Sequence, residues 1–497
     1  MHFEFRPLDS LPRLAWCAHL RRGREAVEVR HGPWVETAPE WFVEGAWAGP
    51  FGGGGVVEAV HLAGTAGRVE PGQVVFCSPH NLCDRLQSIR VGDDLYVSNS
   101  LVFLLRITDD EPDPGYPYYT ADRLLQQQAG IRHPDKQLRT ARGRRALLHD
   151  HCNLAIRPDL SMRRLEKSAI PAPVDYADYV GQLDRIVGAV RANAADPTRR
   201  HRRYRPVVMI SRGYDSPALA VLMKGHGARE AVTVTDCIAD DGTAIGQRLG
   251  YEVTGFERLG FQSLRDAPEA EFHATPPGAD VVMAVCEEQL VGALLVTGRA
   301  YGPLHDAARR APPDLSLGDV GAITGSMMSE FRLRVGFFQF TPYVLANRHP
   351  EALHRMSVAP EMKPWSVGGA YDRPILRRIV EEAGIPHEWF GQRKQASGFH
   401  FMRRPNDMSA AGAADFAAYL RTLPPISRRR RWMHRSFVLL RHLRIDGIRQ
   451  RLCAALGLPP PRRLLVYPLT MVELEMGFAF HWGYARIRSR YDAALGS

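Results

Sequence analysis

One stretch of the chain combines the residue types that bind phosphate. After the apolar run 207–210 come two hydroxyls, one glycine and one carboxylate: Ser211, Gly213, Asp215 and Ser216. A helix-type run follows, so the loop would lie at the positive end of a helix, where backbone N–H groups attract an anion. A carboxylate repels phosphate, so Asp215 suits this chemistry only as a Mg²⁺ ligand.

A plain structural interpretation fits the same six residues. Aspartate and serine are common N-cap residues, so Asp215 and Ser216 also fit an ordinary turn between a strand and a helix. On these residues alone, the phosphate loop and the ordinary turn are evenly balanced.

The elements around the loop favour a nucleotide site. Apolar residues repeat at helical spacing over 175–193. Strands expected at 207–210, 231–236 and 294–298 then alternate with helices expected at 218–224, 243–249 and 281–290. This alternation predicts an α/β fold with a doubly wound parallel sheet, in which ligands bind beyond the carboxyl ends of the strands. Residues 211–216 and 297–306 both lie there.

The sequence patterns before and after the expected sheet differ from each other. Short β-type runs at 56–60, 75–77 and 95–97 predict a β-rich N-terminal part, and no helix-type run follows glycines 52–55, so these read as a turn. Beyond 310 the pattern is mostly helical, with an amphipathic helix at 374–384. We therefore expect three parts: a β-rich domain over 1–170, a nucleotide-binding domain over 171–400 and a basic helical extension over 401–497.

Charge and composition narrow the class of partner. The chain of 497 residues has a formal net charge of +10, which suits an anionic partner. The arginines 428–431, with Trp432 and Arg435, lack an accompanying RNA-binding motif, so a solvated helix end is favoured and nucleic acid is disfavoured. No apolar run is long enough to span a membrane, and the seven cysteines form no C-x-x-C pair. A cytoplasmic location is the default expectation, and a homodimer stays open.

Residues 211–216 resemble the S-G-G-x-D-S loop of PP-loop ATP pyrophosphatases. The order of elements is similar to the synthetase domain of the asparagine synthetase and β-lactam synthetase family, an adenine nucleotide α hydrolase-like fold. Three later stretches match that family in order: 297–302 at its second loop, 330–332 at its E-x-R segment and 393–395 at its late R-x-K segment.

The N-terminal part is similar to the other domain of that family. Residues 90–101 resemble a late stretch of a class II glutamine amidotransferase, an Ntn-hydrolase-like α+β domain. That domain uses an N-terminal cysteine whose own α-amine is the general base. His2 follows Met1 here, and the first cysteine is Cys17. The resemblance therefore implies an inactive glutaminase domain, as in β-lactam synthetases, where the substrate supplies the amine.

The resemblance implies an AMP-forming ligase or cyclase that uses ATP and Mg²⁺. A small-molecule or peptide carboxylate would attack the α-phosphorus of ATP, and an amine would then displace AMP to form an amide. The nucleotide would be held by residues of the two loops: Ser211, Arg212, Gly213, Asp215, Ser216, Thr297, Gly298 and Arg299. Asp215 and Asp306 would hold Mg²⁺. Lys394 or Arg393 would stabilise developing charge, and Glu330 would orient a base or the amine.

Two departures from the family pattern weaken this assignment. Gly302 and Pro303 stand where the family has an Asp-Glu pair, and Arg212 stands where it has a glycine. We hypothesise that Arg212 and Arg299 face the pyrophosphate and replace part of the charge of the metal, because arginine suits bidentate phosphate contacts. The alternatives are a degenerate site that binds nucleotide weakly or not at all, and a PP-loop tRNA-modifying enzyme, which usually carries paired cysteines that this chain lacks.

Overall fold

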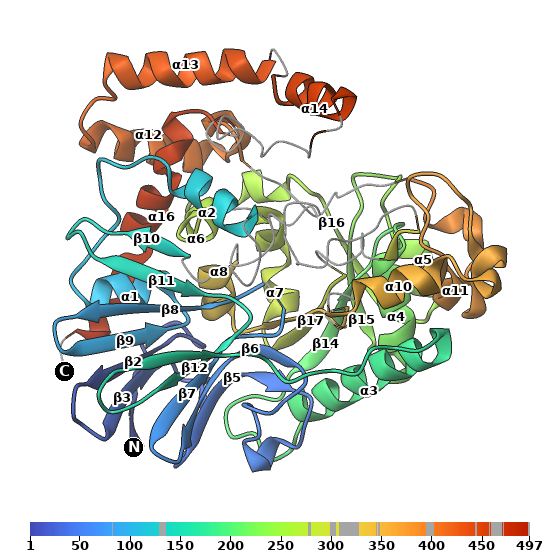
Figure 1. Cartoon of the computed structure of the whole chain (residues 1–497), viewed down its shortest axis with the longest axis horizontal. Helices are drawn as coiled ribbons and strands as arrows, with labels where there is room; N and C mark the ends of the chain where they lie inside the picture. Colours follow the sequence, from blue (N-terminus) through green and yellow to red (C-terminus); the bar gives the residue numbers. More distant parts are fainter. Residues whose placement is uncertain are drawn as a thin grey trace.

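The computed structural model is a mixed α/β structure with a β-rich N-terminal region, a parallel sheet and a helical C-terminal region (Figure 1). It describes residues 1–81, 83–128, 136–276, 280–298, 305–307, 328–343, 345, 348–393, 402–442, 445–456, 458, 470 and 472–495. Among these residues, no helix is long and apolar enough to cross a membrane.

Two sheets form the N-terminal region. The seven-stranded sheet has the order β1 (His2–Pro7), β3 (Ala26–His31), β2 (Trp16–Arg21), β9 (Asp94–Ser98), β8 (Leu86–Val91), β11 (Arg145–His149) and β10 (Gln137–Arg139). The six-stranded sheet has the order β13 (Met162–Leu165), β12 (Asn153–Ile156), β7 (Gln73–Cys77), β6 (Leu62–Glu70), β5 (Trp41–Trp47) and β4 (Glu36–Ala38). Trp16 of the first sheet packs edge-on against Phe42 of the second, at 4.8 Å between ring centroids, within one apolar core.

The β-rich prediction is confirmed, with one error in its detail. Residues 75–77 and 95–97 lie in β7 and β9, but 56–60 form turns after the 3₁₀ helix η1 (Phe51–Gly53) instead of a strand. Val56 is buried in an apolar cluster with Trp47 and Phe51. The valines at this position therefore reflect burial of a turn and not pairing in a sheet.

The parallel sheet has the order β16 (Glu252–Phe256), β15 (Glu230–Val234), β14 (Arg205–Met209), β17 (Ala293–Val296) and β18 (Phe338–Phe340), and every neighbouring pair is parallel. The chain enters at β14 in the middle. It leaves to one side through α4 (Asp215–Gly225) and α5 (Thr243–Arg248), and it returns to the other side at β17. The order of strands thus reverses between β14 and β17, the place where ligands bind in open α/β sheets.

The helices expected before and after this sheet are present. The helix expected at 281–290, between two of its strands, differs from the prediction. Asp175 caps α3 (Tyr176–Ala194) by accepting from Asp178 N, and α11 (Pro374–Glu382) begins at a proline as expected. Residues 281–290 instead form a 3₁₀ helix, η3 (Val281–Cys286), followed by α7 (Glu287–Leu290). Val281–Cys286 is buried almost throughout. When nearly every residue of a segment is buried, apolar and polar residues do not alternate with a helical period. The sequence then gives no signal for the type of helix.

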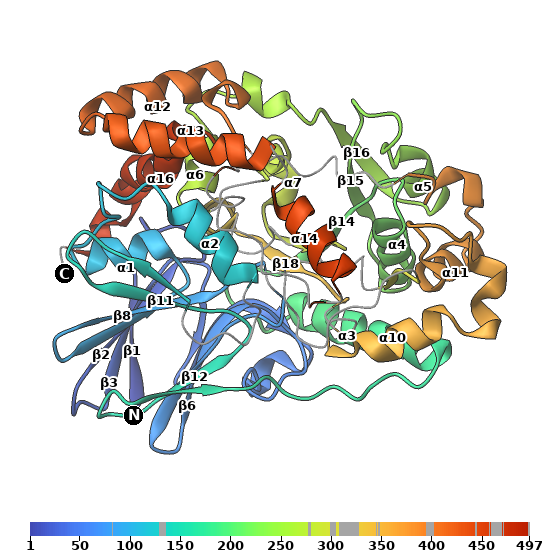
Figure 2. The ribbon, with the colours of Figure 1, turned by 45° about the horizontal axis from the view of Figure 1, so that its top comes forward.

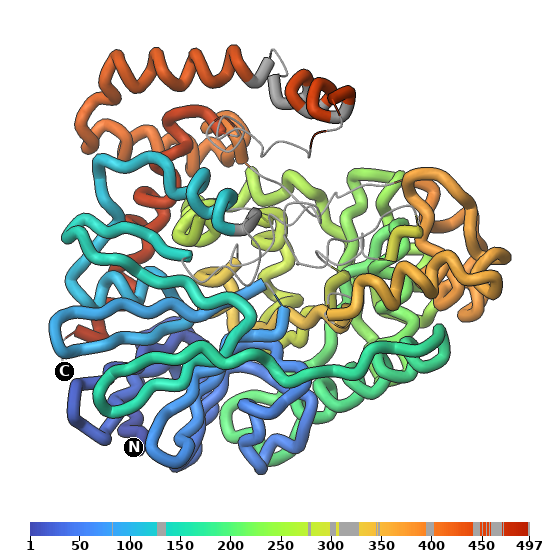
Figure 3. The backbone as a smooth tube through the Cα atoms, in the orientation of Figure 1, coloured from blue at the N-terminus to red at the C-terminus, as the bar shows by residue number. Residues whose placement is uncertain are grey.

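The C-terminal region consists of α12 (Ala410–Thr422), α13 (Arg428–His442), α14 (Ile445–Ala455), α16 (Ala479–Ile487) and the 3₁₀ helix η9 (Arg488–Ala494). Its last two helices pack on earlier parts of the chain. α16 packs against α6 (Glu269–His273), and η9 packs against α1 (Leu101–Ile107), where Tyr491 stacks on Phe103 at 4.9 Å between ring centroids. Figure 3 shows this final segment beside the N-terminal strands. The boundaries expected at 170 and 400 remain predictions.

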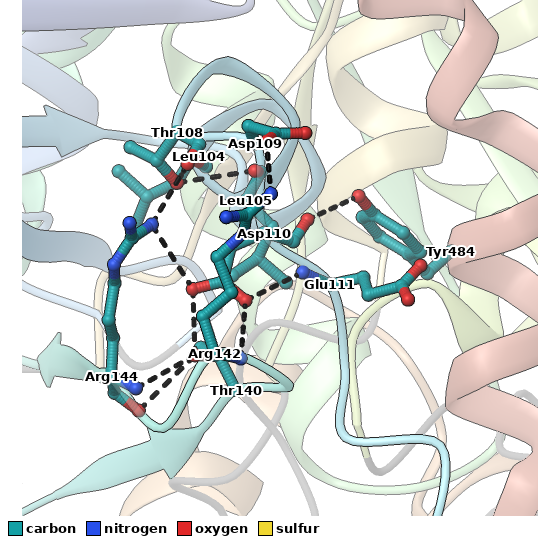
Figure 4. Close-up of polar contacts among 10 residues, drawn as sticks. All are labelled: Leu104, Leu105, Thr108, Asp109, Asp110, Glu111, Thr140, Arg142, Arg144 and Tyr484. Carbon is teal, nitrogen blue, oxygen red and sulfur yellow. Dashed lines mark hydrogen bonds and ion pairs between the residues drawn. The ribbon is translucent and has the colours of Figure 1, made fainter.

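Asp110 organises one of these contacts (Figure 4). Its side chain accepts hydrogen bonds from Thr140 Oγ1 at 2.8 Å and Arg142 N at 3.2 Å, and its carbonyl accepts from the hydroxyl of Tyr484 on α16 at 2.8 Å. Because Asp110 is buried, these bonds fix the turn after α1 to the last helices of the chain.

Candidate functional site

The loop from β14 to α4 brings the two serines together. Ser216 Oγ accepts from Ser211 N at 2.9 Å and lies 2.8 Å from Ser211 Oγ, while Gly213 N donates to Ser211 Oγ at 3.3 Å. The loop is therefore curled around its own hydroxyls. Both serines stay partly exposed, so their oxygens remain accessible to a ligand.

The first turn of α4 begins without a side-chain cap. Its N-cap is Tyr214, whose side chain makes no capping hydrogen bond, and Ser216 Oγ accepts from Ser211 instead of from the helix. The ordinary-turn interpretation, in which Asp215 and Ser216 cap the helix, is thus not the arrangement found in this part of the structure. The N–H groups of an uncapped first turn can donate hydrogen bonds to an anion.

Asp215 is the most constrained residue of the loop. Arg373 Nη1 donates to its Oδ2 at 2.5 Å, and the guanidinium of Arg373 is almost completely buried. The other carboxylate oxygen, Oδ1, is buried and has no hydrogen-bond partner among the described residues. The hydroxyl of Tyr343 donates to the carbonyl of Asp215 at 2.9 Å, which fixes the backbone as well. Burial opposes the charge on Arg373, but Asp215 raises the pKa of Arg373 above its ordinary value.

Residues of the neighbouring strands close in on Asp215. An added Cβ at Gly298, just after β17, would lie 2.6 Å from Asp215 Cβ, so only glycine allows this approach. Thr297 and Thr341 follow β17 and β18, and their hydroxyls are buried without a hydrogen-bond partner among the described residues. Three adjacent strands therefore present unpaired oxygens at their carboxyl ends, and buried polar groups of this kind mark a site for a polar ligand.

Buried tyrosines lie near the carboxylate of Asp215. Burial first, and then the negative charge of Asp215, raise the pKa of Tyr179 and of Tyr343 well above the ordinary value. Tyr179 also bonds to His305 Nε2 at 2.6 Å, and His305 precedes the buried Asp306. Asp306 contributes to the raised pKa of Arg373, so its carboxylate lies within electrostatic reach of that guanidinium.

The guanidinium of Arg212 contacts the main chain, contrary to our hypothesis that it faces the pyrophosphate. It donates to the carbonyls of Trp389 at 2.9 Å, Glu388 at 3.4 Å and Ile238 at 3.4 Å, and Gly391 N donates to the carbonyl of Arg212 at 2.8 Å. Arg212 therefore ties the loop to the segment after α11. Arg212 stands where the family has a glycine. In this conformation its hydrogen bonds to main-chain carbonyls have a structural role.

Other predicted residues are not brought to the loop. Glu330 begins α8 (Ser329–Val335), where it accepts from Ser100 Oγ at 2.6 Å and from the hydroxyl of Tyr491. It thereby joins the N-terminal region to η9. Arg393 is exposed. Arg299 and Lys394 lie outside the described residues, as do Gly302 and Pro303, so the second loop and the late lysine remain predictions.

The E-x-R segment also contains a buried brace. Arg332 donates to Glu44 Oε2 at 2.7 Å and to Asp84 Oδ1 at 2.9 Å, and all three side chains are almost fully buried. The pKa of Arg332 is raised because the two carboxylates outweigh its burial. This segment holds the N-terminal sheets against the parallel sheet, which is a structural role.

Cys17 cannot replace an N-terminal cysteine in its observed position. It is the second residue of β2, its thiol is buried, and burial raises its pKa far above the ordinary value. A thiol in this state is not a nucleophile.

The acids near the loop are too few, among the described residues, to hold a metal ion by themselves. Among the described residues, no group of three or more His, Cys, Asp or Glu side chains could hold a metal. Asp215 Oδ1 is available to one Mg²⁺ ligand position, and Asp306 is the second acid nearby. Because Mg²⁺ in such sites is bound by one or two carboxylates plus phosphate oxygens, the ion would arrive with the nucleotide.

Sequence reasoning missed Arg373 and the tyrosines around it. Arg373 lies 158 positions after Asp215, and no local pattern in the sequence connects the two. Neither a protein-family model nor a curated protein sequence matches the chain.

Proposed function

We propose that the protein is an ATP-dependent, AMP-forming ligase or cyclase. It activates a carboxylate of a small molecule or peptide by adenylation and then forms an amide with an amine of the substrate. The proposal combines the family resemblance of residues 211–216 with the position of this loop in the fold.

The observation that carries the proposal is the placement of the loop at the reversal of strand order. Ser211 and Ser216 lie after β14, and Thr297 lies after β17, on the two sides of that reversal. The uncapped start of α4 and the buried, unpaired oxygens of Asp215 and Thr297 support a ligand that carries both phosphates and donors.

Each residue has a distinct task in this reaction. The hydroxyls of Ser211 and Ser216, with the first N–H groups of α4, would bind the β- and γ-phosphates that leave as pyrophosphate. Asp215 Oδ1 would bind Mg²⁺, which neutralises charge on the phosphates. Arg373, held on the other oxygen of Asp215, adds a fixed positive charge beside the leaving group. The catalytic roles of Arg393, Lys394 and Glu330 stay predictions, and the contacts of Glu330 favour a structural role for it.

The reaction would not draw its amine from glutamine. Burial and a raised pKa make Cys17 unsuited to act as the thiol nucleophile of a glutaminase. We therefore propose that the substrate itself supplies the amine, as the family resemblance implies.

A second candidate is a nucleotide-binding protein without catalysis. The ion pair between Arg373 and Asp215 favours it, because a carboxylate that is already neutralised attracts Mg²⁺ less strongly. The two candidates share the binding site and differ only in turnover.

One pair of measurements tests the proposal and separates the candidates. Calorimetry with ATP and with pyrophosphate, each with and without Mg²⁺, should show binding that Asp215→Ala weakens and that Arg185→Gln, an exposed change on α3, leaves unchanged. Incubation with ATP and pools of amino acids and carboxylic acids should release AMP and pyrophosphate in equal amounts. Binding without AMP release supports the second candidate, and no binding at millimolar ATP excludes both.

A further inference from the structure

The outermost helices of the C-terminal region expose apolar side chains in an ordered pattern. On α14, the exposed residues recur at spacings of three and four: Ile448, Arg451, Leu452, Ala455 and, just beyond the helix, Leu456. This is the spacing by which a helix normally faces a protein core. Here Ile448, Leu452 and Leu456 are all more than half exposed, so the stripe faces solvent.

The preceding helix, α13, also exposes apolar side chains, and it carries more arginines than α14. Its exposed residues other than Arg429 follow one face at 428, 431, 432, 435 and 439, where Trp432 and Leu439 alternate with arginines. Trp432 is 69% exposed and Leu439 is 60% exposed. Figure 1 shows α13 and α14 one after the other along the top of the molecule, beyond α12, and Figure 2 shows both helices on the side that faces the viewer. We call residues 424–458 the basic arm.

The charge of the basic arm indicates which kind of partner could cover it. The basic arm contains nine arginines and one acidic residue, Asp446, so most of the formal net charge of +10 lies in this segment. A second copy of the chain would bring the same positive charge and is repelled. The partner must therefore be anionic and must also accept apolar side chains.

We propose that the basic arm binds the surface of a membrane that contains anionic lipid. Arginines bind lipid phosphates, and a tryptophan and several leucines enter the boundary between headgroups and acyl chains, as in interfacial amphipathic helices. Nucleic acid would use the arginines but leaves the apolar stripe of α14 exposed. An acidic protein satisfies the charge, but on α13 the arginines alternate with apolar residues instead of surrounding an apolar centre as a polar rim.

Sedimentation of the full-length protein with vesicles tests the proposal. Vesicles of phosphatidylcholine containing one-third phosphatidylglycerol should bind at least tenfold more protein than pure phosphatidylcholine, and the difference should shrink as salt rises. Arg431→Gln with Arg435→Gln should weaken binding roughly thirtyfold. Leu452→Ser with Leu456→Ser should weaken it similarly at constant charge.

Matched controls are available elsewhere on the surface. Arg185→Gln removes an exposed arginine from α3, and Ile238→Ser removes a side chain that is 83% exposed near the parallel sheet. Neither should change vesicle binding. Lipids brominated in the acyl chain should quench part of the tryptophan fluorescence, and Trp432→Phe should abolish that part although seven other tryptophans remain.

Three results would overturn the proposal. The first is equal binding to neutral and anionic vesicles. The second is full binding by the two-leucine variant, which would indicate a purely ionic partner such as RNA. The third is release of the protein from vesicles by low concentrations of an acidic, apolar peptide together with unchanged Trp432 fluorescence, which would assign the arm to a protein partner.

Discussion

Arg373 Nη1 lies 2.5 Å from Oδ2 of Asp215, the carboxylate expected to hold Mg²⁺, and the pair is buried beneath the loop from β14 to α4. The positive charge beside the candidate phosphate site thus comes from the residue that precedes α11 and not from the loop itself. Asp215 keeps one oxygen unpaired, so the pair positions the carboxylate without using all of its binding capacity.

This pair should matter for stability as well as for binding. Arg373→Ala leaves the buried carboxylate of Asp215 without compensation, which should lower the free energy of unfolding by about 3–5 kcal/mol. The double variant Asp215→Ala with Arg373→Ala should recover part of this loss in urea unfolding. Arg355→Ala, an exposed change on α10 (Pro350–Ser357), should be nearly neutral. Equal stability of Arg373→Ala and the wild type would contradict the ion pair.

The serine pair should bind phosphate directly. Ser211→Ala or Ser216→Ala should raise the Kd for pyrophosphate by roughly ten- to a hundredfold, because each removes a hydrogen bond to a charged group. Ser216→Ala should have the larger effect, since Ser216 Oγ also accepts from Ser211 N and holds the loop. Calorimetry measures both. Ser263→Ala, an exposed serine of the same region, is the control and should bind as the wild type does.

Gly298 should tolerate no side chain. In Gly298→Ala the new Cβ would lie 2.6 Å from Asp215 Cβ, so the strand end must move away from α4. We expect a clear loss of stability, about 1–3 kcal/mol, and a loss of nucleotide binding. Gly225→Ala, at the end of α4, meets no atom within 4 Å and should stabilise slightly if at all. Thermal unfolding of both variants checks the contrast, and a stable, nucleotide-binding Gly298→Ala protein would refute it.

Glu330 should make stability depend on pH. Burial raises the pKa of Glu330 above its ordinary value of 4.5, so the folded state holds the proton more tightly than the unfolded state. The contribution is therefore fully present below pH 4.5 and is lost as the pH rises through the higher folded pKa. Glu330→Gln, which cannot ionise, should flatten this part of the stability curve. Urea unfolding from pH 4.5 to 7 measures it; parallel curves for both proteins would show that Glu330 does not titrate there.

The order of elements was predictable because local patterns determine it. Periodicity placed α3 and the strands of the parallel sheet, and the alternation of strand and helix indicated parallel pairing. The serine and glycine composition of the loop pointed to the end of β14, and the assignment of this place as a nucleotide site stays a prediction. The valines at 56–60 show the limit, because β-branched residues also fill buried turns.

The chemistry around the loop was less predictable because it depends on distant contacts. Arg212 looked like a phosphate ligand from its position in the motif, but its partners lie at 238 and 388–389. The catalytic role expected of Glu330 stays a prediction, and its carboxylate accepts hydrogen bonds from Ser100 and Tyr491, which the sequence did not indicate. A motif specifies the position of a residue in the backbone. The contacts of its side chain depend on how the other elements pack around it.

The packing of η9 on α1 has a consequence for the order of folding during synthesis. Tyr491 closes a contact with Phe103 across nearly the whole chain, and Glu330 joins both ends of that contact. The first hundred residues leave the ribosome long before their partners exist, and contacts so distant in sequence form slowly. Until residues 488–494 emerge, one side of α1 is uncovered, so a nascent chain should depend on chaperones that shield it.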